Sequence, residues 1–261
     1  MPMDYEGFKK EIYKLTGINL SYYKEKQMKR RINSLIKKNN YDTYDAYVRA
    51  IKSDKELFNE FINYLTINVS EFYRNPEQWE VLEKDILPDL LKKSRYPKIW
   101  SAACSTGDEP YTLVMILNKF LPLENIRILA TDIDRQAIEK AKIGLYLKKS
   151  VEKLPVELLK KYFTIERDLY KINDEVKKCV EFRHHDLLKD EYPKSCDLIV
   201  CRNVLIYFTE EAKDYVYRKL NGSLKTGGVL FVGSTEQILM ANRYSFYPIK
   251  TFFYIKEKDI S

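Results

Sequence analysis

Histidine, cysteine and glycine are scarce in this sequence of 261 residues, which contains two, four and eight of them. The four cysteines lack CxxC spacing, so they form neither a zinc-ligand pattern nor a disulfide framework. The only histidines, His184 and His185, are adjacent at an expected strand end. This disfavours catalysis by a Ser/His/Asp or Cys/His relay. We expect no bound metal and no hydrolase of these classes.

Long apolar runs are also missing. No stretch approaches the roughly 18 apolar residues that a membrane-spanning helix needs. The first six residues, MPMDYE, lack the basic-then-apolar order of a signal peptide. With 45% apolar and 32% charged residues, the composition is that of a globular protein. We therefore expect a cytoplasmic protein that does not insert into membranes.

The positive charge is concentrated near the N-terminus. The net charge is +7, and residues 1–40 hold ten lysines and arginines against four acids. Such a basic segment attracts an acidic partner, which can be nucleic acid, anionic lipid or an acidic protein helix. A solvated helix face is the alternative.

The first 75 residues have the spacing of helices. In the basic segment, Met28, Ile32 and Leu35 recur at intervals of three and four, and similar stripes precede and follow it. Asp42 and Asp54 are expected as N-caps. We predict a small all-helical domain over residues 1–75, with a connecting helix over 76–97.

From about residue 98, short β-rich runs alternate with helical stretches. The expected strands are 99–103, 126–131, 180–184, 197–201 and 229–233, with a terminal antiparallel hairpin at 246–256. The expected helices are 110–120, 135–143 and 210–220. This alternation is typical of a parallel sheet covered on both faces. We predict an α/β fold with a doubly wound, mostly parallel sheet over residues 98–261.

In such a sheet, ligands bind beyond the carboxyl ends of the strands. Asp132, at the end of the second strand, is an acid of the kind that accepts ribose hydroxyls. The loop after the first strand has Gly107 but no three-glycine cradle, and Asp108 and Glu109 would repel a pyrophosphate. The pattern disfavours NAD and ATP and favours a nucleoside with a cationic, phosphate-free tail, such as S-adenosylmethionine. A helix N-terminus with ordinary capping acids is the alternative.

Five motifs resemble those of the chemotaxis receptor glutamate methyltransferases (CheR type). They are TINVSEFYR at 66–74, WSAACSTGDEPY at 100–111, ATDID at 130–134, CRNVLIYF at 201–208 and GSTE at 233–236. The resemblance covers almost the entire chain. It implies the S-adenosylmethionine-dependent methyltransferase fold. It also implies an enzyme that esterifies glutamate side chains on the cytoplasmic helices of chemoreceptors and releases S-adenosylhomocysteine.

The resemblance also implies site residues. The cofactor contacts fall on Asn68, Ser70, Arg74, Gly107, Glu109, Asp132, Asp186, Leu187, Arg202 and Asn203. Ser70 stands where the family often has Thr, and Asp186 where Asn is common. Because a glutamate carboxylate is already ionised at neutral pH, methyl transfer to it requires no general base.

Arg74 and Tyr207 are the catalytic candidates, since they can hold a carboxylate and donate a hydrogen bond beside the methyl group. An interdomain salt bridge and a core aromatic are the alternative roles. The basic helix is expected to dock along the acidic helical bundle of a receptor through Arg30, Arg31, Lys37 and Lys38.

One departure from the family concerns receptor tethering. Members that bind a peptide at the receptor C-terminus have a glycine-containing loop in a small antiparallel β-subdomain, expected here at about 160–182. Strands are expected near 163–164 and 170–172, but residues 164–178 contain no glycine. We therefore expect no binding of a C-terminal pentapeptide.

Two other functions are also compatible with part of this pattern. A nucleic-acid methyltransferase would share the cofactor fold and a basic surface, but amino-directed enzymes of that class have a Pro-Pro-aromatic segment where this chain has Arg202-Asn203-Val204-Leu205. A non-catalytic adaptor that binds S-adenosylmethionine is the other. We expect no nucleic-acid partner.

Overall fold

The computed structural model describes residues 3–258 and separates them into two compact units. One unit combines the residues up to Asn68 with Tyr207–Asp214, and the other contains Val69–Ile206 and the residues from Tyr215 onward. The sequence pattern placed residues 207–214 with the sheet and the end of the helical domain at residue 75. The two divisions differ because the units depend on backbone contacts between residues far apart in the chain, and such contacts leave no periodic pattern in the sequence.

The helical unit contains four α-helices among its described residues. They are α1 (Tyr5–Thr16), α2 (Glu25–Lys38), α3 (Tyr44–Ser53) and α4 (Lys55–Thr66), with a short 3-10 turn, η1 (Leu20–Tyr22). The fully buried rings of Phe8, Tyr47 and Phe61 pack at its centre. Asp54 caps α4 as predicted, whereas the N-cap of α3 is Thr43 and not Asp42, because the Thr43 hydroxyl is the group that accepts the Ala46 N–H.

The second unit is built on a seven-stranded sheet with the order β6-β2-β1-β7-β8-β10-β9. The strands are β1 (Ile99–Ala102), β2 (Ile128–Asp132), β6 (Val180–His184), β7 (Cys196–Cys201), β8 (Leu224–Val232), β9 (Phe246–Lys250) and β10 (Phe253–Lys256). The first five are parallel, and β10 runs antiparallel to both β8 and β9. The mostly parallel sheet and terminal hairpin are as predicted. Strand order reverses between β1 and β7, which makes their carboxyl ends the switch point where such sheets bind ligands.

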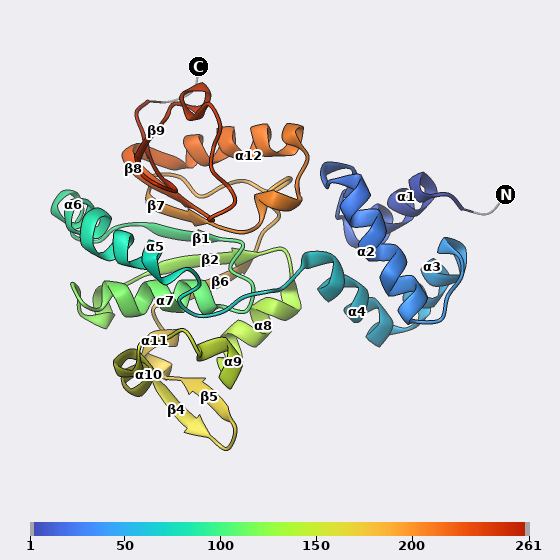
Figure 1. The fold of residues 1–261 in the computed structure, drawn as a ribbon, viewed down its shortest axis with the longest axis horizontal. Helices are drawn as coiled ribbons and strands as arrows, with labels where there is room; N and C mark the ends of the chain where they lie inside the picture. The colour runs from blue at the N-terminus through green and yellow to red at the C-terminus, as the bar shows by residue number, and fades with distance from the viewer. Residues whose placement is uncertain (1–2, 259–261) are drawn as a thin grey trace. The chain divides into compact units, whose positions relative to one another are not determined.

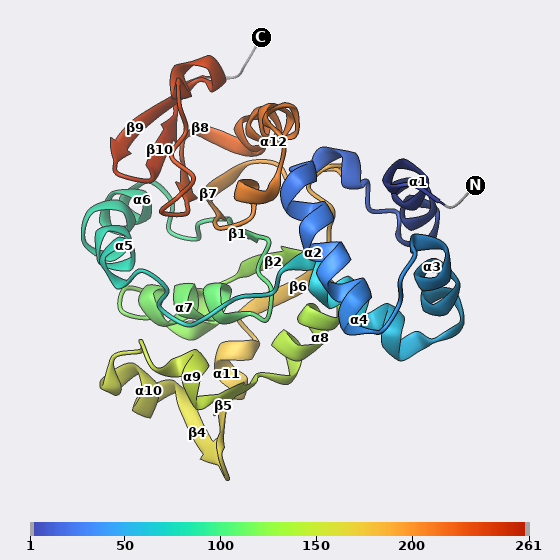
Figure 2. The ribbon, with the colours of Figure 1, turned by 45° about the vertical axis from the view of Figure 1, so that its right-hand side comes forward.

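Helices cover both faces of this sheet. A segment of α5 (Pro76–Val81), the π-helical η2 (Leu82–Ile86) and α6 (Leu87–Lys93) precedes β1. The crossover helices are α7 (Asp108–Leu117), α8 (Arg135–Ile143) and α12 (Glu210–Ser223), and the remaining 3-10 turns are η3 (Leu123–Asn125), η4 (Leu205–Tyr207) and η5 (Ala241–Tyr244). Figures 1 and 2 show α7 on one face and α12 on the other, as right-handed connections in opposite directions from the switch point require.

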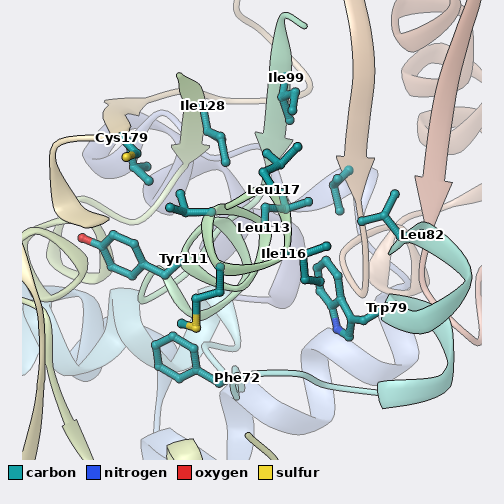
Figure 3. Packing of buried hydrophobic residues seen from close by; sticks show 14 of the residues in the cluster. Phe72, Trp79, Leu82, Ile99, Tyr111, Leu113, Ile116, Leu117, Ile128 and Cys179 are labelled. Atoms are coloured by element: carbon teal, nitrogen blue, oxygen red, sulfur yellow. The ribbon is translucent and has the colours of Figure 1, made fainter. Parts of the chain in front are cut away.

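The core of this unit surrounds α7, which is buried on nearly every side. Figure 3 shows Leu113 and Leu117 facing Ile99 and Ile128 of the sheet, with Ile116 beside Trp79. A helix packed this tightly cannot shift easily, so its N-terminus is a rigid support for the loop that precedes it.

A separate three-stranded antiparallel sheet has the order β3-β5-β4. Its strands are β3 (Leu145–Leu147), β4 (Phe163–Glu166) and β5 (Leu169–Ile172), with the short helices α9 (Lys148–Val151), α10 (Val156–Tyr162) and α11 (Asp174–Lys177) around them. The sequence predicted β4 and β5 but missed β3, which is three residues long and lies outside the expected range. Within residues 3–258, no helix has the length and apolar composition needed to cross a bilayer.

Candidate functional site

The loop between β1 and α7 has a backbone that few residue types tolerate. Ala103, Ser105 and Gly107 all have positive φ, and Gly107 is at +89°. A Cβ atom at Gly107 would lie 2.8 Å from the Cβ of Ala141 and 3.1 Å from the ring of Tyr111. Glycine is therefore required here for both conformation and space. Gly107 thus shapes the loop in which the predicted cofactor contact falls.

Asp132 ends β2 and holds this loop. Its Oδ2 accepts the Ser105 N–H at 2.7 Å, and its Oδ1 accepts the Asp134 N–H at 2.9 Å. Burial raises the pKa of Asp132 to about 6 despite these hydrogen bonds, which favour the charged form. A buried carboxylate gains from further donors, such as a pair of ribose hydroxyls, because they offset the loss of water.

Glu109 lies in the first turn of α7 with a side chain 13% exposed. The Ser101 hydroxyl donates to its Oε1 at 2.8 Å, and Nη1 of Arg202 lies 3.7 Å from its Oε2. Burial raises the pKa of Glu109 to about 7, since it outweighs the opposing effects of Arg202, Ser101 and the charge of Arg74. A cationic group bound beside Glu109 would stabilise the charged form of its carboxyl.

Arg202 follows β7, and its guanidinium lies over two aromatic rings that contact each other edge to face. Its guanidinium carbon lies 4.9 Å from the ring centroid of Trp79 and 4.6 Å from that of Phe231. Nη2 donates to the Gln78 side-chain oxygen at 2.8 Å and to the Arg74 carbonyl at 3.1 Å. These contacts give Arg202 a structural role, tying the end of β7 to residues 74–78, in addition to the cofactor contact that the resemblance implies.

Ser70 and Arg74 lie in the irregular segment before α5. Ser70 hydrogen bonds to the carboxyl of the buried Asp108. Burial raises the pKa of this carboxyl more than the hydrogen bond from Ser70 lowers it. The Arg74 side chain donates through Nη1 to the Val69 carbonyl at 3.0 Å, and its charge acts on Glu109. The structure thus brings both residues to the loop that follows β1.

Glu236 is a buried acid whose role the sequence pattern did not reveal. Its carboxylate accepts the backbone N–H groups of Asn203, Leu205 at 2.7 Å, Ile206 at 3.3 Å and Gly233 at 3.0 Å. Burial raises the pKa of Glu236, while the four N–H groups oppose that shift. The carboxylate therefore fixes the turn after β7, in which Asn203 has a φ of +59°.

A sequence signal for Glu236 does exist. It lies four residues beyond the end of β8, at the same sheet edge as the other acids, and it closes the GSTE motif. An acid just after an apolar strand of a parallel sheet points to that edge.

Asp186 and Leu187 follow β6, next to β2 in the sheet. The Asp186 carboxylate accepts the Leu188 N–H at 2.8 Å, and burial raises the pKa of Asp186. Leu187 is buried, and its carbonyl accepts the Tyr192 hydroxyl at 2.7 Å. The loop is tied to the site because the His185 N–H donates to the Asp132 carbonyl at 2.9 Å.

Two predicted site residues, Asn68 and Tyr207, belong to the helical unit. The Asn68 side chain donates to the Thr66 hydroxyl at 3.1 Å. The Tyr207 carbonyl accepts the N–H of Lys24 at 2.9 Å. The structure therefore gathers the other predicted cofactor residues at one sheet edge and assigns these two to the helices.

The predicted docking residues on α2 differ in their surroundings. The Arg31 guanidinium donates to the Tyr64 carbonyl at 2.7 Å and stacks on the Tyr64 ring, and Lys38 pairs with Glu60 at 2.7 Å. Arg30 and Lys37 are exposed. Both border a shallow hollow of 420 Å³ on this helix, which is lined by Lys26, Lys29, Arg30, Asn33, Ser34 and Lys37.

Comparison with known proteins gives family matches for both parts of the chain. Residues 3–66 match the model described as CheR methyltransferase, all-alpha domain, and residues 68–254 match CheR methyltransferase, SAM binding domain. A chemotaxis protein methyltransferase of Listeria innocua is 45% identical over 254 residues, which cover 97% of each chain. Chemotaxis protein methyltransferase 2 of Vibrio cholerae is 34% identical over 95% of this chain and 90% of that protein.

Proposed function

The chain belongs to the CheR methyltransferase family, and from this premise we propose which residues perform its reaction. It is an S-adenosylmethionine-dependent protein-glutamate O-methyltransferase, and it forms methyl esters on chemoreceptor glutamates for chemotactic adaptation. The observation that carries this function is the match of both family domains, together with 45% identity to a chemotaxis protein methyltransferase over 97% of the chain.

The residues at the sheet edge fit this cofactor. Buried Asp132 suits the ribose hydroxyls. An ammonium group beside the buried Glu109 would supply the positive charge that lowers the raised pKa of this carboxyl. Leu187 offers an apolar surface to a base. We propose that Ser70, Asn68, Asp186 and Asn203 complete the contacts. When bound, the cofactor supplies an electrophilic methyl group on a sulfonium.

The residues of the chain then have to align and desolvate an acceptor carboxylate. The acceptor glutamate is ionised at neutral pH, so no proton has to be removed. Positioning supplies up to about 7–11 kcal/mol in reactions of this kind. We propose that Arg74 holds a carboxylate through parallel donors and that Tyr207 donates one hydrogen bond to the acceptor.

We propose that the acidic helical bundle of the receptor docks on α2 in the cytoplasm. The exposed cations Arg30 and Lys37, with Lys26 and Lys29 beside them, present a field complementary to acidic helices. Arg31 and Lys38 contribute charge to the same helix while holding Tyr64 and Glu60. We propose no tethering through a receptor C-terminal pentapeptide.

A single assay tests the reaction. The protein is incubated with methyl-labelled S-adenosylmethionine and chemoreceptor-containing membranes, and the labelled receptor is then treated with mild alkali. Release of the label as methanol is expected because a glutamate methyl ester hydrolyses under these conditions. Cofactor binding without transfer would instead indicate an adaptor, and alkali-stable label would exclude an ester.

Two variants test the catalytic assignments. Arg74→Lys keeps the charge but loses the planar fork, and Tyr207→Phe loses only the hydroxyl. Each is expected to lower kcat by about tenfold to a hundredfold while the protein remains folded. An unchanged kcat in either variant would remove that residue from the proposed mechanism without affecting the family assignment.

A further inference from the structure

The segment that contains Tyr207 is paired with the N-terminal residues of the helical unit. The Lys24 N–H donates to the Tyr207 carbonyl at 2.9 Å, and the Thr209 N–H donates to the Tyr22 carbonyl at 2.9 Å. An antiparallel bridge joins Tyr23 and Phe208 between these two hydrogen bonds. Two hydrogen bonds around one residue pair fix the backbone direction on both sides of Phe208.

The side chains reinforce this bridge. The rings of Tyr23 and Phe208 meet edge to face, with centroids 5.1 Å apart and planes at 89°. Phe208 is 4% exposed. Because Phe208 is anchored in the helical unit by its ring and its backbone, the backbone of the preceding residue, Tyr207, is held in place as well.

The bridge is continuous with the basic helix. Tyr23 and Lys24 connect η1, where Leu20 is 2% exposed, to α2, which begins at Glu25. The Tyr207 carbonyl is thus hydrogen-bonded directly to Lys24, the residue that precedes α2. The basic face of α2 and the backbone of Tyr207 therefore belong to the same packed structure.

We propose that Tyr23 is a positioning residue for methyl transfer. Through Phe208 and the backbone bridge, it sets the place of Tyr207, so the helical unit carries both the basic docking face and the tyrosine that acts on the acceptor. This inference rests on the proposed role of Tyr207. It assigns a task to the Leu20–Lys24 segment that neither its charge nor its sequence indicates.

The first test compares variants of Tyr23 in the full chain. Tyr23→Ala is expected to lower kcat about tenfold, because a small misplacement of an aligned group costs that much or more. The Kd of S-adenosylmethionine and the KM for receptor membranes should stay within about twofold, since neither the sheet edge nor the exposed cations are altered. Tyr23→Phe keeps the ring pair and should restore kcat. Tyr13→Ala, at an exposed tyrosine of α1, is the matched control.

The second test is a double-mutant cycle with Tyr207→Phe. If Tyr23 acts through Tyr207, Tyr23→Ala should lower kcat by less than about twofold in the Tyr207→Phe background. A further tenfold loss there, or an unchanged kcat for Tyr23→Ala alone, would overturn the positioning role. Should circular dichroism show that Tyr23→Ala unfolds the helical unit, Tyr23→Leu takes its place in the cycle.

The cycle also separates this inference from the proposed function. An unchanged kcat for Tyr207→Phe would reject the role of Tyr207 and the positioning role with it. A loss for Tyr207→Phe combined with full activity of Tyr23→Ala would reject the positioning role alone. Loss of the alkali-labile product in the parent protein would reject the reaction itself.

Discussion

Arg202 and Glu109 face each other at 3.7 Å, yet the arginine does not keep the glutamate in its ordinary state of ionisation. The guanidinium is shared among Gln78, the Arg74 carbonyl and two aromatic rings, and burial raises the pKa of Glu109 to about 7. The pair therefore leaves a carboxyl that titrates near neutrality at the centre of the cofactor residues.

Cofactor affinity should consequently depend on pH. Protonated Glu109 and Asp132, with pKa values of about 7 and 6, bind a cationic nucleoside poorly, so its binding releases protons. Between pH 7.5 and 6 the affinity should fall as pH falls, approaching about tenfold per unit, and more steeply below pH 6. Calorimetry over about pH 5.5–7.5 measures this, and below about pH 7 an α-ammonium of the ligand stays almost fully charged. A flat profile would contradict it.

Glu109→Gln is the matched variant for that experiment. The amide keeps the size of the side chain but cannot ionise, so affinity at pH 7.5 should fall by about tenfold to a hundredfold. The pH dependence between 6 and 7.5 should shrink to about the twofold change that Asp132 alone contributes. A variant that retained the parent's profile would assign the titration to another group.

Gly107→Ala should destabilise the protein and weaken cofactor binding. The new methyl group would meet Ala141 at 2.8 Å in a left-handed backbone conformation, which should cost at least about 2 kcal/mol. Thermal unfolding and calorimetry measure the two effects. Gly222→Ala is the control, because Gly222 lies in α12 with nothing near its Cβ position, and alanine should stabilise that helix slightly.

Glu236→Gln should weaken cofactor binding by loosening the turn that holds Asn203, although Glu236 is not itself a predicted cofactor contact. The side-chain NH₂ of glutamine would face some of the backbone N–H groups that now donate hydrogen bonds to the carboxylate, so that two donors would oppose each other. We expect a loss of about 1–3 kcal/mol in unfolding free energy and a larger Kd for S-adenosylmethionine. Glu124→Gln, at an exposed acid, should change neither quantity. Equal behaviour of the two variants would reject the role of Glu236.

Charge reversal on α2 should affect the receptor and not the cofactor. The double variant Arg30→Glu/Lys37→Glu should raise the KM for receptor membranes by about tenfold at low salt, and the difference should shrink as salt is added. Arg31 is left intact because it supports Tyr64. Lys10→Glu/Lys55→Glu makes the same change in net charge on exposed positions of α1 and α4. Equal KM values for the two double variants would reject docking on α2.

A receptor C-terminal pentapeptide should give no saturable heat in calorimetry. The β4–β5 turn has Arg167 at a φ of +56° and no glycine. Arg167→Gly places one there, at a position whose conformation suits it. Micromolar binding to the parent protein would overturn the prediction, and binding to the variant alone would attribute the difference to the missing glycine.

Much of the fold follows from local sequence. The helix predicted at 135–143 has those bounds in the structure, because Asp134 caps its start and Gly144, at a φ of +73°, ends it. The strands were predicted to within a few residues, except that β8 begins earlier. β3 was missed because three residues are too few to show a period, and it is stabilised by contacts with distant residues, namely its pairing with β5 and the packing of Tyr146.

The sequence by itself determined the chemistry of the site: acids at the ends of β1 and β2, a single glycine in the first loop, and the five motifs of the family. Only the tertiary structure decided that Arg202 lies over the rings of Trp79 and Phe231, that Glu236 holds the turn after β7, and that Tyr207–Asp214 packs with the helices. The physical reason is the separation of the interacting residues along the chain. Caps, turns and periodic stripes act within a few residues, whereas these contacts join groups tens to hundreds of positions apart and exist only once both elements are packed.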